Sequence, residues 1–125
     1  MSAVLWQRVE GALVFVAALF AVAAQSFMGL SGYWWLYLIA LVAPDIGLLG
    51  YLAGPKVGAA VYNLLDLYGL GLALAVLGWM IFGSPLYTSV GLLWMAHVGV
   101  DRMLGFGLKE QTAFADTHLG RIGRK

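Results

Sequence analysis

Hydrophobic residues fill four long runs of the chain, and only short connections separate the runs. The runs cover about residues 4–28, 33–53, 57–82 and 86–108. The connections contain the glycine and proline residues that are typical of tight turns, at 29–32, 54–56 and 83–85. Because a transmembrane helix needs about 20 apolar residues, each run is long enough to cross a bilayer.

The runs must form helices, because backbone polar groups cannot stay unpaired in hydrocarbon and the alternating pattern of a barrel strand is absent. The short connection at 54–56 predicts that the second and third helices are antiparallel neighbours. We therefore predict an all-α integral membrane protein. Residues 1–109 would form an antiparallel four-helix bundle, and residues 110–125 a C-terminal tail.

The composition supports this class and excludes several others. Of the 125 residues, 62% are hydrophobic and 10% are charged, whereas soluble domains carry about 25% charged residues. The absence of cysteine excludes thiol redox chemistry, thiolate metal ligands and covalent haem attachment. The net charge of +1 gives no indication of a nucleic-acid partner.

Basic residues set the predicted orientation. The connections at 29–32 and 83–85 contain none, and the opposite face holds Arg8, Lys56, Lys109, Arg121, Arg124 and Lys125. By the positive-inside rule, both termini and the tail should be cytoplasmic. Trp34, Trp35 and Trp79 then fall near the uncharged interface, where amphipathic aromatic rings tend to lie.

Several ionisable residues fall at similar depths. Counted inward at 1.5 Å per residue, Asp45 and Asp66 lie roughly 13 Å deep, Asp101 roughly 12 Å and His97 roughly 18 Å, with Glu10 slightly shallower. The i,i+4 spacing of His97 and Asp101 puts both on one helix face. A charge at the bilayer centre costs at least ~2.5 kcal/mol and usually faces the bundle interior. We therefore predict one shared polar pocket that opens toward the cytoplasm.

Some of these polar residues also have a purely structural interpretation. Arg8 and Glu10 could extend to the headgroups, and Arg102 could simply pair with Asp101 or Glu10. Asn63 could join two helices through its amide.

The GxxxG motif at 50–54 allows two helices to approach closely. It would serve packing within the chain or formation of a homodimer, and we favour packing within the chain.

Motifs spread along nearly the whole chain resemble a known family. They are RVEG at 8–11, APDIGLLGYLAGPKVGAAVYN at 43–63, WMAHVGVDRMLGFGLK at 94–109 and FADTHLGRIG at 114–123. The chain resembles the DUF4260 family of small bacterial integral membrane proteins, a domain of unknown function. The resemblance implies a multi-pass protein of the bacterial inner (cytoplasmic) membrane. It points to the motif positions Arg8, Glu10, Asp45, Asn63, His97, Asp101, Arg102, Thr117 and His118.

The first functional hypothesis is a membrane-embedded enzyme that acts on a lipid-soluble substrate, with membrane lipids and a hydrophobic small molecule as partners. Its catalytic residues would be Asp45, Asp66, His97 and Asp101. The same four side chains offer ligands for a divalent metal ion, or an acid/base set without metal. Residues that would bind the substrate are Glu10, Asn63, Arg102 and His118, with Arg102 suited to an anionic headgroup.

Two other functions stay open. A small proton-coupled multidrug-type transporter could work as a homodimer, with Glu10, Asp45 or Asp101 exchanging protons; alternatively, the chain could be a structural membrane subunit. The lysines lie only at predicted helix ends, which disfavours a retinal Schiff base. A single intramembrane histidine cannot supply two axial ligands to haem, so we expect neither cofactor.

Overall fold

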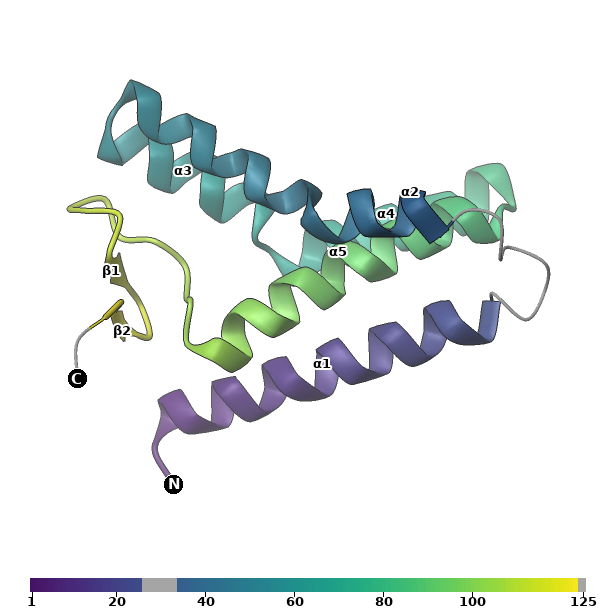
Figure 1. Ribbon diagram of the computed structural model, residues 1–125, viewed down its shortest axis with the longest axis horizontal. Coiled ribbons are helices and arrows are strands. Elements are labelled where there is room, and N and C mark those ends of the chain that lie inside the picture. The colour runs from purple at the N-terminus through teal and green to yellow at the C-terminus, as the bar shows by residue number, and fades with distance from the viewer. Residues whose placement is uncertain (26–33, 124–125) are drawn as a thin grey trace.

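The computed structural model in Figure 1 describes residues 1–25 and 34–123. The prediction of a mainly helical protein is confirmed. The helices are α1 (Ala3–Gln25), α2 (Trp34–Val42), the 3₁₀ helix η3 (Ala43–Ala53), α3 (Pro55–Leu65), α4 (Tyr68–Phe82) and α5 (Pro85–Leu104). A small antiparallel hairpin of β1 (Asp116–Thr117) and β2 (Gly120–Arg121) follows. The predicted connection at 29–32 lies outside the described residues.

Among the residues that the structure describes, two helices are long and apolar enough to cross a membrane, α1 and the segment Trp34–Ala53. A third crossing is available if α3 and α4, which bend by 43° at their junction, form one broken span. Large apolar side chains cover their outward faces: Phe20 is 73% exposed, Leu52 89% and Met80 75%. Apolar surface on this scale is typical of a protein that faces lipid.

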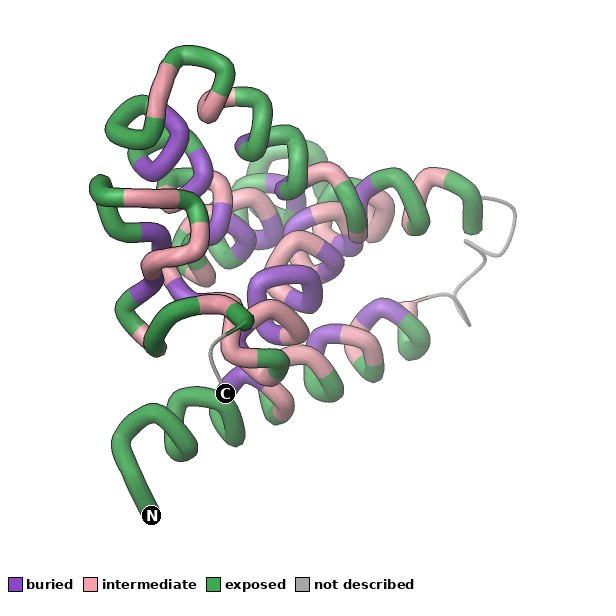
Figure 2. Tube along the Cα trace, turned by 60° about the vertical axis from the view of Figure 1, so that its left-hand side comes forward, coloured by how far each residue is buried: buried purple, intermediate pink, exposed green. Residues whose placement is uncertain are grey.

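The most buried helix is α5, which lies against α1, α4 and α2 (Figures 1 and 2). Small residues let these helices approach closely. A Cβ atom on Gly99 would lie 2.8 Å from the Gly11 carbonyl oxygen of α1, and one on Gly91 would lie 2.6 Å from the Gly71 carbonyl oxygen of α4. Its neighbours therefore shield α5 and the ionisable residues that it carries.

The second predicted run changes helix type at Ala43. From Ala43 to Ala53 it is a 3₁₀ helix, although 3₁₀ segments longer than three or four residues are uncommon. It packs closely on α3, since a Cβ atom on Gly50 would lie 2.9 Å from the Val61 Cβ. Gly50 of the GxxxG motif thus serves packing within the chain, whereas Gly54 makes the turn to α3 with a φ of 106°.

The run that the sequence predicts as one crossing, 57–82, is interrupted after Leu65. Side chains of α5 bind the carbonyl groups that this break frees: Trp94 Nε1 donates to the Leu65 oxygen at 2.7 Å, and Arg102 Nη2 donates to the Asp66 oxygen at 2.8 Å. These bonds replace the helical hydrogen bonds, which have to be satisfied in a membrane.

After α5 the tail folds back against α3, where the Lys109 backbone forms hydrogen bonds with Asn63. α5 ends at Leu104, four residues before the predicted limit at 108. The next residue, Gly105, ends the helix with a left-handed φ of 92°. Lys109 then pairs with Thr117 in an antiparallel bridge. The start of α1, the β1–β2 hairpin and the turn between η3 and α3 lie at the same end of the molecule (Figure 1).

Candidate functional site

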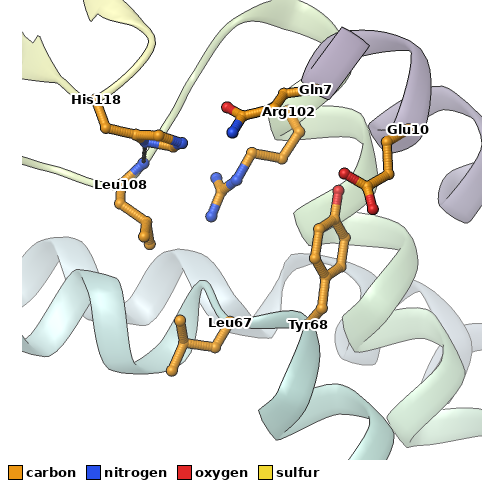
Figure 3. A pocket seen from close by; sticks show the side chains of 7 residues that line it. All are labelled: Gln7, Glu10, Leu67, Tyr68, Arg102, Leu108 and His118. Carbon is orange, nitrogen blue, oxygen red and sulfur yellow. Dashed lines mark hydrogen bonds between the residues drawn. The ribbon is translucent and has the colours of Figure 1, made fainter. Parts of the chain in front are cut away.

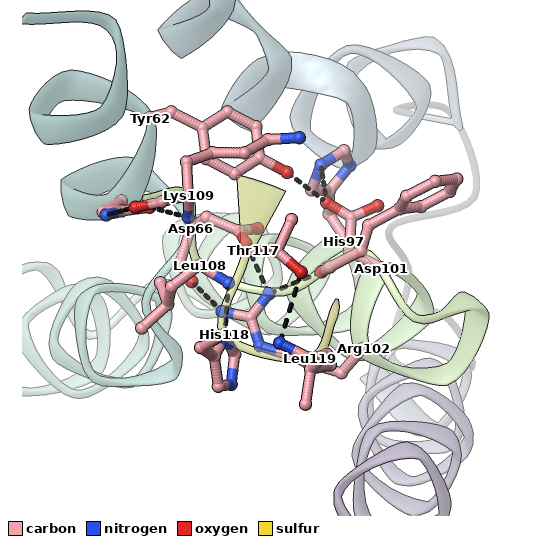
Figure 4. A network of polar contacts seen from close by, with 12 residues as sticks. Tyr62, Asp66, His97, Asp101, Arg102, Leu108, Lys109, Thr117, His118 and Leu119 are labelled. Atoms are coloured by element: carbon pink, nitrogen blue, oxygen red, sulfur yellow. Dashed lines mark hydrogen bonds and ion pairs between the residues drawn. The ribbon is translucent and has the colours of Figure 1, made fainter. Parts of the chain in front are cut away.

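Ionisable side chains form two neighbouring groups at the end of the molecule that holds the start of α1 and the tail. One lines a cavity bounded by α1, the start of α4 and the tail (Figure 3). The other surrounds His97 of α5 (Figure 4).

The His97 ring is fixed by a hydrogen bond to the backbone of α2. Its Nδ1 lies 2.8 Å from the Leu41 carbonyl oxygen, and because a carbonyl only accepts hydrogen bonds, Nδ1 carries the proton. In the 3₁₀ pattern that begins here, the partner of the Leu41 carbonyl would be the amide of residue 44. That residue is Pro44, which has no N–H, so this carbonyl is available to His97.

The other ring nitrogen of His97 faces two carboxylates. Nε2 lies 3.2 Å from Asp45 Oδ1 of η3 and 3.3 Å from Asp101 Oδ2, one turn along α5. One ligand atom from each of the three residues lies within 4.8 Å of the other two. The side chains of His97 and Asp101 are 9% and 14% exposed and that of Asp45 is 52% exposed, so the group is accessible from the Asp45 side.

A cavity of about 340 Å³ adjoins the Asp45–His97–Asp101 group. It is lined by Asp45, Leu48, Tyr62, Asp101, Phe106, Lys109, Phe114 and Ile122. The Tyr62 hydroxyl donates a hydrogen bond to Asp101 Oδ2 at 3.1 Å. Carboxylates, a phenol and an ammonium group therefore share the cavity with apolar side chains from η3 and the tail.

The Lys109 side chain lines this cavity, and contacts from two directions hold its backbone. Its N–H donates to Asn63 Oδ1 at 2.6 Å and its carbonyl accepts from Asn63 Nδ2 at 2.8 Å, while Thr117 pairs with it from the tail. Its Nζ lies 3.9 Å from the centre of the Phe114 ring and 5.1 Å from that of Tyr62. Burial lowers the pKa of Lys109, and the charges of Asp101 and Asp66 oppose that fall.

Asp66 and Arg102 form a separate ion pair that is closed to solvent. The Arg102 Nη1 atom donates to Asp66 Oδ2 at 2.6 Å and to the Phe106 carbonyl at 2.9 Å. The side chains of Asp66 and Arg102 are only 2% and 8% exposed. Each ion compensates the other, as buried charges require.

Arg102 also lines the cavity in Figure 3, which measures about 190 Å³. His118 Nδ1 accepts the Leu108 N–H at 2.8 Å, so the proton of the neutral ring sits on Nε2. Burial, followed by the charge of Arg102, lowers the pKa of His118 and keeps the ring neutral. Within the described residues, the buried Tyr68 hydroxyl has no hydrogen-bond partner.

The family pattern named as a domain of unknown function, DUF4260, matches residues 4–122. The chain belongs to the DUF4260 family. The predicted family relationship is thereby confirmed. No curated protein and no solved structure matches the chain.

In this DUF4260 protein, three of the four predicted catalytic and metal-binding residues come together: Asp45, His97 and Asp101. The fourth, Asp66, binds Arg102 instead. Three of the residues predicted to bind substrate line the cavity shown in Figure 3: Glu10, Arg102 and His118. Asn63 contacts neither cavity and holds the Lys109 backbone.

Sequence reasoning missed two side chains of the DUF4260 site and one backbone group. Tyr62 and Lys109 lie within the motifs at 43–63 and 94–109, but the sequence assigns neither a role in a site. Lys109 serves there only to set the orientation and to disfavour a retinal Schiff base. The Leu41 carbonyl could have been found from Pro44, because a proline leaves a preceding helical carbonyl without its donor.

Proposed function

We propose that this protein is a membrane-embedded enzyme that acts on a lipid-soluble substrate, with Asp45, His97 and Asp101 as ligands of a divalent metal ion. The observation that carries the proposal is the orientation of His97. Its Nδ1–H is bound to a carbonyl, and its Nε2 points between two carboxylates. Metal-binding histidines almost always donate their second N–H in this way.

The distances support a metal centre. Two ligands that are each about 2.1 Å from a metal lie about 3.4 Å apart in a tetrahedron. The Nε2 atom lies 3.2 and 3.3 Å from its two carboxylate partners. Three protein ligands with one further position open is the arrangement of catalytic zinc sites, and imidazole with carboxylates also suits iron or manganese.

The chemistry follows from the ligands and the cavity. A metal ion bound here would polarise a substrate oxygen or lower the pKa of a bound water molecule. The apolar cavity lining, from Leu48, Phe106 and Phe114, would hold the hydrophobic part of the substrate. Tyr62, through its hydrogen bond, would keep Asp101 oriented as a ligand.

We further propose that the chain crosses the inner membrane of a bacterium four times, with α5 as the last crossing and both termini in the cytoplasm. The positive-inside distribution of basic residues supports this orientation. Shielding of α5 by α1, α2 and α4 supports a crossing in spite of its three ionisable residues. The cavity beside His97 would then open near the cytoplasmic interface.

Metal content tests the enzyme proposal. We expect the purified protein to carry about one metal ion per chain, as measured by elemental analysis. His97→Ala should lose the ion, whereas His118→Ala, a matched control in the same protein, should retain it. A metal-free wild type, or equal metal content in the His97→Ala variant, would overturn the proposal. A metal-free protein that exchanges a cationic solute for protons in liposomes would identify a transporter instead.

A further inference from the structure

Lys109 is a buried cation with an unusual set of neighbours. The residue is only 5% exposed, and its backbone is fixed by Asn63 on one side and by Thr117 on the other. Two aromatic rings flank its ammonium group, those of Phe114 and Tyr62. Across the residues that the structure describes, no carboxylate forms an ion pair with it.

The charges around the cavity determine what Lys109 can bind. A divalent metal ion would neutralise the carboxylates of Asp45 and Asp101, and neutral His97 would add no charge. The ammonium of Lys109 would then be an uncompensated positive charge in a partly apolar cavity. Burying an unpaired ion is costly unless a partner of opposite sign is supplied.

Arg102, the residue that sequence reasoning assigned to an anionic headgroup, already has a carboxylate partner. Its two terminal nitrogens donate to Asp66 and to the Phe106 carbonyl. Lys109 lacks such a partner and lines the same cavity as two of the proposed metal ligands.

We infer that the substrate is an amphiphile with an oxyanion head, a phosphate or a carboxylate, which binds the Lys109 ammonium beside the metal ion. This inference rests on the proposed function. The apolar part of the molecule lies against Leu48, Phe106, Phe114 and Ile122, which line the rest of the cavity. An ammonium group binds phosphate as a compact point charge, and the pair is strengthened where water is excluded.

Binding of short-chain lipids to the purified, metal-loaded protein tests the inference. The probes are dihexanoyl phosphatidate, dihexanoylglycerol, which has the same chains without the phosphate, hexanoate and inorganic phosphate, each measured by titration calorimetry. Lys109→Met should weaken phosphatidate binding about ten-fold or more, the usual effect of losing a hydrogen bond to a charged group. Lys109→Arg should retain most of the affinity, because it keeps the charge.

Lys56→Met is the matched control, because Lys56 is an exposed lysine at the same end of the molecule and does not line the cavity. It should bind phosphatidate like the wild type. Dihexanoylglycerol should bind more weakly than phosphatidate and should not respond to Lys109→Met. Metal content and unfolding temperature, measured for each variant, establish that the site is intact.

The outcomes separate this inference from the proposed function. Bound metal together with equal phosphatidate affinity in Lys109→Met and the wild type would overturn the inference alone. Absence of metal from the wild type would overturn the proposed function. Inorganic phosphate that binds as tightly as phosphatidate, and in a Lys109-dependent way, would show a site for free anions and would overturn the inference of an amphiphile. Hexanoate that binds more tightly than phosphatidate, again in a Lys109-dependent way, would support the inference and identify the head group as a carboxylate.

Discussion

Two adjacent residues of α5 take part in charge clusters of opposite character. Arg102 and Asp66 form a closed pair, 2.6 Å apart, with both side chains more than nine-tenths buried. Asp101 belongs to an open group, in which His97 Nε2 lies 3.2 Å from Asp45 and 3.3 Å from Asp101. Asp45 is half exposed, and both carboxylates line a cavity.

The difference shows how two neighbouring residues of one helix can belong to a structural ion pair and to a proposed metal centre. Asp66 lies at the break between α3 and α4, and Arg102 binds both its side chain and its carbonyl. That pair holds a distorted backbone together. In contrast, the histidine of the His97 group is oriented by a backbone carbonyl, and its Nε2 faces two carboxylates, as the proposed metal site requires.

The largest expected effect is on the closed pair. Arg102→Met should destabilise the fold by about 3–5 kcal/mol, because it leaves the Asp66 carboxylate buried without a counter-ion. Unfolding in detergent, followed by circular dichroism, would measure this. The double variant Arg102→Met/Asp66→Leu should recover much of the loss, since replacing both ions by apolar groups is often neutral. Equal instability of the single and double variants would mean that the pair has no such role.

A smaller effect on stability but a clear effect on binding is expected at the open group. Asp45→Asn should weaken metal binding at least about 100-fold, beyond the range seen for residues that only support a ligand. The unfolding free energy of the metal-free protein should change by less than about 1 kcal/mol, because Asp45 is half exposed. Competition with a chelator measures the first quantity. A large loss of stability together with unchanged metal binding would show that Asp45 has a structural role and is not a metal ligand.

The smallest effect concerns the tail and its pH dependence. Because the pKa of His118 is lowered in the fold, the neutral ring contributes stability that is complete above its ordinary pKa of 6.5 and is lost as pH falls through the lowered value. Protonation would also remove the acceptor of the Leu108 N–H. Hydrogen exchange at Leu108 should therefore accelerate, relative to buried amides of α5, between pH 7.5 and about pH 5. His118→Gln should abolish this dependence; an unchanged profile would contradict the role of His118.

Much of the fold and part of the site follow from the sequence. The apolar runs predict helices, and the i,i+4 spacing of His97 and Asp101 fixes their common face. Asp45 joins them because it lies in the first turn of η3, directly after α2, which packs against α5.

The remaining features depend on contacts that spacing does not encode. The depth of Asp66 matches that of Asp45, yet the break at Asp66 directs its side chain to Arg102. The tail brings Lys109 into the cavity through long-range contacts with Asn63 and Thr117. Depth counting assumes straight, continuous helices, so it could reveal neither the break nor the return of the tail.

An experimental structure of the zinc-loaded protein, with anomalous scattering recorded at the zinc edge, tests the metal centre most directly. The account predicts one strong peak about 2.0–2.2 Å from His97 Nε2 and from an oxygen of each of Asp45 and Asp101. A peak elsewhere, or no peak while Nε2 remains hydrogen-bonded to both carboxylates, would contradict it.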